Sequence, residues 1–244
     1  MNMPEIARIE VLVSKGCPNA QEANELARSV AGQLGPGITV DQLMVDSLER
    51  AAGLGFLGSP SFRVNGSDIE GKATSAGSLC CRTYEGGQGT PPRWLLEAAV
   101  LRELRPRGIL FLCVANSARS QMAEGIARAL LPAGVRVWSA GSRPTRVRPE
   151  AIAALGELSI DISKHRSKHV SEVPASEVDT VITLCNEEEC PIFLGEARRL
   201  HWGLPDPAAA GGSEPERLDA FRRTRDELLR RIATLAGKDQ REGP

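Results

Sequence analysis

The stretch GILFLCVANSARSQMAEGIARALL, residues 108–131, joins two regular patterns through a short polar loop. GILFLC is a continuous apolar run typical of a buried parallel strand, and SQMAEGIARALL places Met122, Ile126 and Leu130 on one helix face. The loop between them, residues 113–120, therefore leads into a helix N-terminus. Backbone N–H groups converge there and the helix dipole favours a bound anion. The stretch predicts a strand, an anion-binding loop and a helix.

A cysteine opens this loop and an arginine follows it after five residues. Loop amides that hold an oxyanion also stabilise the thiolate of Cys113, and Arg119 offers a two-pronged donor to an anion's oxygens. A buried, inert thiol with an exposed arginine is the alternative, which the strand, loop and helix order disfavours. The expected oxyanion-binding residues are Val114, Ala115, Asn116, Ser117, Ala118, Arg119 and Ser120.

The composition of the 244-residue chain sets limits on its partners. Its 30 lysines and arginines nearly cancel 31 aspartates and glutamates, so nucleic acid and anionic membranes are not expected partners. Neither a signal peptide pattern nor a membrane-spanning apolar run is present, which predicts a cytoplasmic protein. In that reducing setting the six cysteines favour catalysis or redox chemistry over permanent disulfides. We expect no metal site and no cofactor, since the three histidines lack zinc-finger spacing.

The segment LRPRG, residues 104–108, marks a domain boundary, because proline and glycine there separate a helical pattern from a fresh strand. We expect one domain at residues 1–105 and a second at 106–244. In the first domain the residue patterns predict six elements. They are a strand at 9–13, a helix ending at Gly35, a strand at 38–46, a short helix at 47–55, a hairpin at 61–71 turned at Asn65-Gly66, and a helix at 92–104.

This order of elements resembles the thioredoxin family. Cys17 stands where that family has its active-site cysteine, and Ser59-Pro60 precedes the third strand, where the resemblance implies a cis-proline. Ala20 replaces the second cysteine of the CxxC motif, so disulfide exchange cannot run inside the motif.

Two further cysteines of the first domain, Cys80 and Cys81, lie between the hairpin and the last helix. They are candidate accessory redox residues together with Cys17, if their glycine-rich segment approaches it. Three unrelated thiols are an equally open interpretation, because spacing does not determine connectivity.

The second domain predicts an α/β fold, a central parallel sheet with helices on both faces, because strand and helix patterns alternate. After CVANSARS come WSAGS, IDISKHRSK, VITLCNEEECP and HWGLPDPA, in that order. These stretches resemble the low-molecular-weight tyrosine phosphatases and, within that fold, the thioredoxin-coupled arsenate reductases.

The resemblance implies a stepwise reduction of arsenate. Cys113 attacks arsenic while Asp206 protonates the departing oxygen, Cys185 then attacks Cys113 and releases arsenite, and Cys190 resolves the disulfide. Thioredoxin or a low-molecular-weight thiol is the implied electron donor. Some relatives bind potassium through a Thr and an Asp where this chain has Arg166 and Lys168, so we expect a fixed positive charge and no potassium site.

Two alternatives remain open. A low-molecular-weight protein tyrosine phosphatase also uses Cys113, Arg119 and Asp206, but it needs no second thiol, and the family's phosphatases carry a tyrosine where Ala208 stands. An arsenite- or mercury-binding thiol protein is the other alternative, with the cysteines of the first domain as soft ligands.

Overall fold

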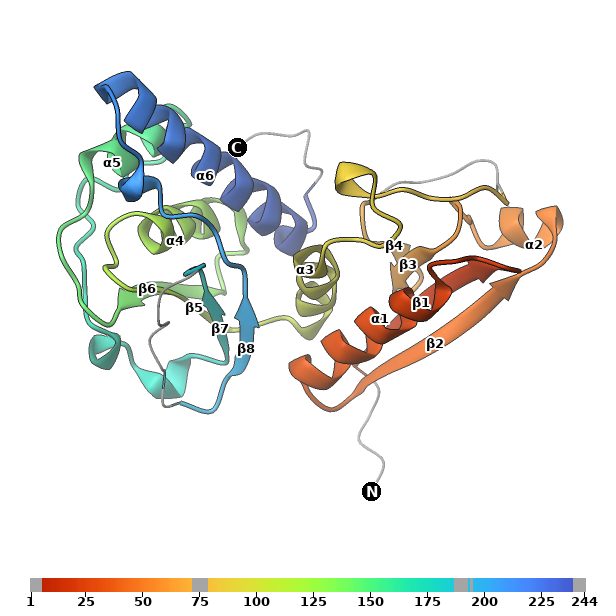
Figure 1. Ribbon diagram of the computed structural model, residues 1–244. Helices are drawn as coiled ribbons and strands as arrows, with labels where there is room; N and C mark the ends of the chain where they lie inside the picture. Colours follow the sequence, from red (N-terminus) through yellow and green to blue (C-terminus); the bar gives the residue numbers. More distant parts are fainter. Residues whose placement is uncertain (1–5, 72–78, 187–192, 194, 239–244) are drawn as a thin grey trace. The chain divides into compact units, whose positions relative to one another are not determined.

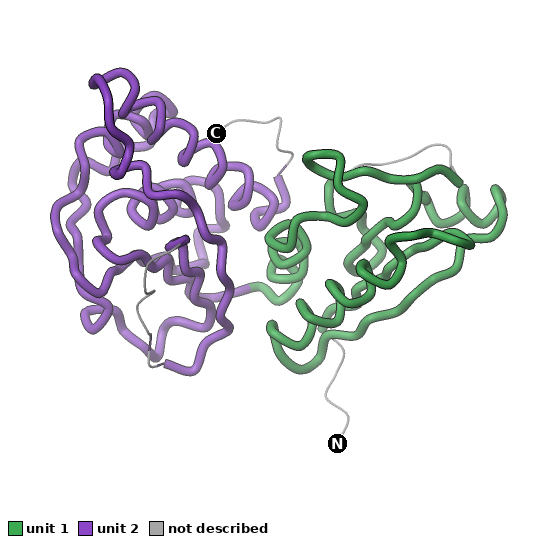
Figure 2. Tube along the Cα trace, viewed as in Figure 1, with its two compact units in different colours: residues 1–105 green, residues 106–244 purple. Residues whose placement is uncertain are grey.

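The computed structural model describes residues 6–71, 79–186, 193 and 195–238 of the chain. It divides into two compact units, Met1–Arg105 and Pro106–Pro244, which Figure 2 shows in separate colours. In the described residues no helix is both long and apolar enough to cross a membrane. The two units are called unit 1 and unit 2 below.

Unit 1 is built on a mixed sheet with the strand order β2-β1-β3-β4. β1 pairs in parallel with β2 and antiparallel with β3, which pairs antiparallel with β4. The elements are β1 (Ala7–Ser14), α1 (Ala20–Leu34), β2 (Ile38–Val45), α2 (Leu48–Gly53), β3 (Ser61–Val64), β4 (Ser67–Asp68), the 3-10 helix η1 (Glu85–Gly87) and α3 (Arg93–Leu104).

The two faces of this sheet carry different helices. α1 and α3 pack against one face, with α1 along β1 and β2 and α3 against β1 and β3 (Figure 1). On the other face Leu12 packs with Ala51 of α2 and with Phe56. The hairpin turn has positive φ at Asn65 and Gly66, 49° and 81°, as its sequence predicts. The Ser59-Pro60 peptide bond is cis, which confirms that prediction.

Unit 2 contains a parallel sheet with the strand order β6-β5-β7-β8. Its elements are β5 (Gly108–Cys113), α4 (Arg119–Leu130), β6 (Arg136–Gly141), α5 (Pro149–Gly156), the 3-10 helices η2 (Val170–Glu172) and η3 (Ala175–Glu177), β7 (Thr180–Thr183), β8 (Arg198–His201), the 3-10 helix η4 (Pro207–Ala209) and α6 (Glu214–Ala236). The parallel sheet flanked by helices confirms the predicted fold class.

The two faces of the unit 2 sheet are covered by different elements. α4 packs against β5 and β6, and α6 packs on α4 and α5 (Figure 1). The opposite face, formed by Leu110, Leu112 and Val181, packs against Val173 and Val178 beside the short η2 and η3. Among the residues that the structure describes, 3-10 turns and a loop therefore cover this second face.

The carboxyl ends of β5 and β7 lie side by side. Leu112 pairs with Thr183, and the Leu184 N–H donates a hydrogen bond to the Leu112 oxygen at 2.8 Å. Parallel strands end at the same edge of a sheet, so the loops after β5 and β7 leave from neighbouring positions. This edge carries Cys113 and Cys185, the first two of the cysteines predicted to act in sequence.

Candidate active site

The oxyanion loop, residues 113–120, turns its carbonyl groups outward. Val114, Ala115 and Ser117 each accept a hydrogen bond at the carbonyl oxygen from an N–H group of the segment 143–148, at 2.9, 3.0 and 2.9 Å. Because the carbonyl groups are held outside, the N–H groups of the loop are left to face its centre. Such a ring of N–H groups at the start of α4 suits a tetrahedral anion.

Strand β6 ends against this loop at Gly141, where a side chain has no room. A Cβ atom at Gly141 would lie 2.3 Å from the Val114 oxygen and 2.9 Å from the Asn116 nitrogen. The glycine therefore allows the backbone of β6 to support the loop directly.

Cys113 is 3% exposed and ends β5 at the base of the loop. Its sulfur accepts a hydrogen bond from the Asn116 N–H at 3.2 Å and lies 2.9 Å from Ser120 Oγ. Asn116 Nδ2 donates to the same Ser120 oxygen at 2.9 Å, which leaves the hydroxyl hydrogen of Ser120 available to the sulfur. Two hydrogen-bond donors therefore converge on the sulfur of Cys113.

Asn116 holds the centre of the loop and is fully buried, with φ of 46°. Asparagine tolerates this left-handed conformation better than most residues. Its Nδ2 also donates to Ser139 Oγ at 2.9 Å, and its Oδ1 accepts from the Lys168 N–H at 2.8 Å and from Gln121 Nε2 at 3.0 Å. The side chain thus connects the loop to β6 and to the segment after α5.

A buried glutamate, Glu124, lies behind the loop and was not among the residues predicted from the sequence. Ser139 Oγ donates to Glu124 Oε2 at 2.5 Å, Lys168 Nζ lies 3.3 Å from the same oxygen, and Arg128 pairs with the other oxygen at 2.5 Å. One signal existed in the sequence: a glutamate one turn after Ser120 on the helix that the loop enters. The salt-bridged carboxylate of Glu124 therefore holds Ser139, and Ser139 accepts the hydrogen bond that helps to position Asn116.

The two residues at the expected potassium-ligand positions behave differently. Lys168 is half-buried and places its ammonium beside Glu124, whereas Arg166 is exposed and pairs with Glu172 at 2.8 Å. Of these two residues, Lys168 alone therefore brings its positive charge to Glu124, which Arg128 also contacts.

Arg119 and Asp206 meet above the loop. Arg119, the first residue of α4, is 4% exposed; its Nη1 donates to the Leu204 oxygen at 2.8 Å, and its Nη2 lies 3.7 Å from Asp206 Oδ2. Asp206 accepts a hydrogen bond from the Ala208 N–H at 3.1 Å, through which it caps η4. The carboxyl group is half-buried, so it lies close to the anion clamp and remains in contact with solvent.

Cys185 is fully buried and follows β7 at the sheet edge where Cys113 ends β5. Since Leu112 is paired with Thr183, Cys185 lies one residue beyond the position level with Cys113. Neighbouring strands are about 4.8 Å apart, so the two cysteines occupy adjacent places on this edge. Cys190, the third member of the predicted series, lies outside the described residues.

Three candidate accessory cysteines belong to unit 1. Cys17 precedes α1 and is half-buried, while Cys80 and Cys81 are exposed, and all three are thiols. Within the described residues, no cluster of three histidine, cysteine, aspartate or glutamate side chains is arranged to hold a metal ion.

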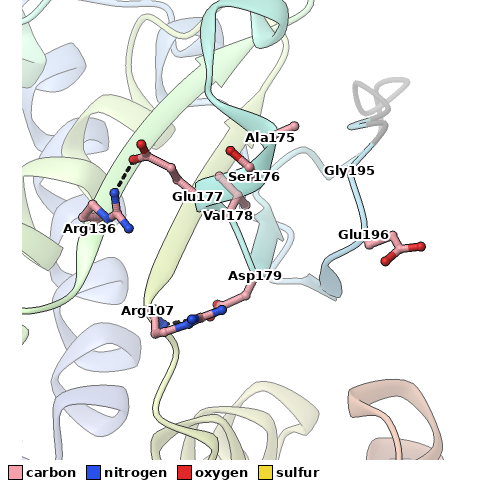
Figure 3. Close-up of a pocket in the computed structure, with 9 residues that line it drawn as sticks. All are labelled: Arg107, Arg136, Ala175, Ser176, Glu177, Val178, Asp179, Gly195 and Glu196. Carbon is pink, nitrogen blue, oxygen red and sulfur yellow. Dashed lines mark hydrogen bonds and ion pairs between the residues drawn. The ribbon is translucent and has the colours of Figure 1, made fainter.

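A hollow of about 450 Å³ in unit 2 lies away from this site (Figure 3). Arg107, Arg136 and Asp179 line it at the amino ends of β5, β6 and β7, the sheet edge opposite to Cys113. Its charged groups pair with each other, Arg136 with Glu177 at 2.7 Å and Arg107 with Asp179 at 3.7 Å. The hollow and the oxyanion loop are therefore separate features.

Comparison with known proteins gives matches to unit 2. Residues 108–243 match the low molecular weight phosphotyrosine protein phosphatase family. The chain is 42% identical over 130 residues to an arsenate reductase of Halalkalibacterium halodurans and 41% identical to one of Bacillus subtilis, in each case over 52% of this chain and 94% of the relative. A solved arsenate reductase of Archaeoglobus fulgidus is 27% identical, with a TM-score of 0.46 over 53% of this chain and 99% of that one. The chain thus belongs, through its residues 108–243, to the low molecular weight phosphotyrosine protein phosphatase family.

Proposed function

We propose that this protein is an arsenate reductase that converts arsenate to arsenite with electrons from thiols. The observation that carries the proposal is the position of Cys185, a buried thiol that follows the strand next to the one that ends at Cys113. A phosphatase of this fold completes its reaction with water, whereas the reduction of As(V) requires two electrons and hence a second thiol. The arsenate reductases of H. halodurans and B. subtilis, similar to this chain over nearly their whole length, support the same reaction.

In the first step arsenate binds to the N–H groups of the oxyanion loop and to the Arg119 guanidinium. The Cys113 thiolate, held by the donors from Asn116 and Ser120, attacks arsenic and forms a sulfur–arsenic bond. An oxygen of arsenate accepts the proton of Asp206 and leaves as water. The 3.7 Å contact between Asp206 and Arg119 supports this role, because it keeps the acid next to the anion.

In the second step Cys185 attacks the sulfur of Cys113. A disulfide forms, the electron pair of the sulfur–arsenic bond passes to arsenic, and As(V) leaves as As(III) in arsenite. Two thiols lose the two electrons that arsenic gains, so the step is balanced. Cys190 then attacks Cys185 and frees Cys113, and an external dithiol, thioredoxin or a low-molecular-weight thiol of the cytoplasm, reduces the remaining disulfide.

The test is arsenate-dependent consumption of NADPH in the presence of thioredoxin and thioredoxin reductase. The wild-type chain is expected to turn over, and Cys185→Ser is expected to lose steady-state reduction. Cys80→Ser, which removes an exposed thiol of unit 1, is the matched control and keeps the wild-type rate. Sustained turnover by Cys185→Ser would refute the proposed role of Cys185.

Hydrolysis of p-nitrophenyl phosphate, measured on the same samples, separates the phosphatase alternative. The oxyanion loop also suits a phosphate ester, and its hydrolysis needs Cys113 but not Cys185. A chain that hydrolyses the ester rapidly and consumes no reductant with arsenate would be a phosphatase.

A further inference from the structure

Two cysteine-bearing segments of unit 1 meet at Ser59. On one side the Ser59 N–H donates to the Cys80 oxygen at 2.8 Å, and the Arg82 N–H donates to the Ser59 oxygen at 3.0 Å. These bonds pair Ser59 with Cys81 in a parallel β-bridge. The segment 80–82 therefore lies beside Ser59 and is joined to it through one isolated β-bridge.

The segment that leads to Cys17 contacts Ser59 as well. The Ser14 N–H, at the end of β1, donates to Ser59 Oγ at 3.0 Å, and the Cys17 N–H donates to the Ser14 oxygen at 3.2 Å. Cys17 thus lies in the tight turn between β1 and α1. It is linked to Ser59 through two hydrogen bonds, both of them made by Ser14.

The segment 80–82 is held firmly. Arg82 is 6% exposed, donates to both carboxylate oxygens of Asp68 at 2.5 and 2.9 Å, and lies 4.6 Å from the centre of the Tyr84 ring. Tyr84 Oη donates to the Pro60 oxygen at 3.0 Å. At Gly58 a Cβ atom would lie 3.0 Å from the Arg82 nitrogen, so the two backbones are in close contact.

The position of Arg82 indicates which cysteine faces Cys17. Its Nη1 donates to Ser61 Oγ at 3.1 Å, and Ser61 is paired with Leu12, which points to the face that carries α2. Successive side chains of an extended segment point to opposite faces. Cys81 therefore points away from Arg82, to the face that carries α1, the helix that begins just after Cys17.

We propose that Cys17 and Cys81 form a dithiol site that binds trivalent arsenic. Thiolates are soft ligands and suit a soft ion. Arsenite reacts as As(OH)₃ with two thiols to give a dithiolate that keeps one hydroxyl, with release of two water molecules and no change of oxidation state. The choice of arsenite as ligand rests on the proposed function, of which it is the product; the thiol pair itself rests on the structure of unit 1.

The test uses the full-length chain with Cys113→Ser, Cys185→Ser and Cys190→Ser, which removes the thiols of unit 2, and phenylarsine oxide as probe. Phenylarsine oxide joins two thiols and releases one water. The reduced protein is expected to take up one phenylarsenic group, seen by intact mass spectrometry, that survives a large excess of a monothiol. Arsenite added first is expected to compete.

Single substitutions in that background locate the site. Cys17→Ser and Cys81→Ser are each expected to weaken probe binding about a hundredfold, because a bidentate contact becomes monodentate. Cys80→Ser is the matched control and is expected to bind as the parent does. Thermal melting curves confirm that each variant is folded.

A monothiol-resistant adduct that persists in Cys17→Ser or Cys81→Ser would overturn the proposal, and its loss in Cys80→Ser would point to the adjacent pair instead. Because the background lacks the unit 2 thiols, the result does not depend on arsenate turnover. If the wild-type chain reduced arsenate but the background bound no probe, the dithiol site would fail and the reductase would stand. The reverse pair of results would leave a soft-ligand site and refute the reductase.

Discussion

Ser120 Oγ lies 2.9 Å from the sulfur of Cys113 while it accepts a hydrogen bond from Asn116. Because Asn116 donates to the Ser120 oxygen, the hydroxyl hydrogen of Ser120 is available to donate to the sulfur of Cys113. Loss of a hydrogen bond to a charged group costs about 1.5 kcal/mol, which corresponds to about a tenfold change in an equilibrium.

Ser120→Ala is accordingly expected to slow alkylation of Cys113 by iodoacetamide at pH 7 about tenfold, because the sulfur loses one of its two hydrogen-bond partners. Peptide mass spectrometry measures the rate at Cys113 itself. Ser142→Ala, which changes a serine just after β6, is the control. An unchanged alkylation rate in Ser120→Ala would show that the Asn116 N–H alone is sufficient to hold the reactive sulfur.

Removal of the Lys168 ammonium is expected to destabilise unit 2. Glu124 is 2% exposed, and Lys168→Met leaves this buried carboxylate with one charge partner fewer, at a cost of about 1–3 kcal/mol. Arg166→Met, which breaks only the exposed pair with Glu172, is expected to leave the free energy of unfolding nearly unchanged. Urea unfolding measures both variants, and equal losses would contradict the assignment.

The same network predicts the response to potassium. The wild-type rate of arsenate reduction is expected to be equal in potassium and sodium salts at matched ionic strength, because the Lys168 ammonium supplies the positive charge next to Glu124. A several-fold stimulation by potassium alone would be the contrary result.

Gly141→Ala is expected to destabilise the oxyanion loop. The new Cβ atom would come within 2.3 Å of the Val114 oxygen, and forced overpacking costs about 1–3 kcal/mol. We expect a lower melting temperature and weaker protection of the protein by phosphate. Gly156→Ala, at the end of α5 with nothing within 4 Å, is the matched control and leaves both quantities nearly unchanged.

The low pKa of Glu157 leads us to expect that the stability of unit 2 falls in acid. Hydrogen bonds from Arg222, with a further one from Arg225, lower the pKa of Glu157 from 4.5 to about 2. A carboxyl group whose pKa is lower in the folded than in the unfolded state stabilises the fold at pH values above its unfolded pKa. This stabilisation is lost as pH falls from 4.5 towards 2. Glu157→Gln is therefore expected to reduce the slope of unfolding free energy against pH in this window. The exposed Glu196→Gln serves as control, and equal slopes for both variants would contradict the prediction.

The sequence predicted what depends on local patterns. The apolar run of β5, the helix after it and the Asn65-Gly66 turn were each predictable, because periodicity and turn chemistry act over a few residues. That Cys113 and Cys185 lie at one sheet edge depends on the strand order, which the structure shows and the sequence patterns did not predict.

The contacts behind the loop were not predictable in the same way. Glu124 and Ser139 lie on a helix and a strand whose relative register depends on tertiary packing, so no short pattern joins them. Likewise the pairing of Cys81 with Ser59 depends on the burial of Arg82 against Asp68, a contact between residues that single-sequence periodicity does not connect.

The outward hydrogen bonds of Val114, Ala115 and Ser117 have a consequence for selectivity. They hold the proposed anion-binding loop in shape before any substrate arrives, so we expect it to bind arsenate and phosphate alike, two tetrahedral ions of nearly equal size and charge. The protein would then distinguish arsenate from phosphate by the reaction that follows binding and not by binding itself. We expect phosphate to bind and dissociate unchanged. Arsenate bonded to the sulfur of Cys113 can instead be reduced to arsenite, and attack by the neighbouring thiol of Cys185 makes that step irreversible.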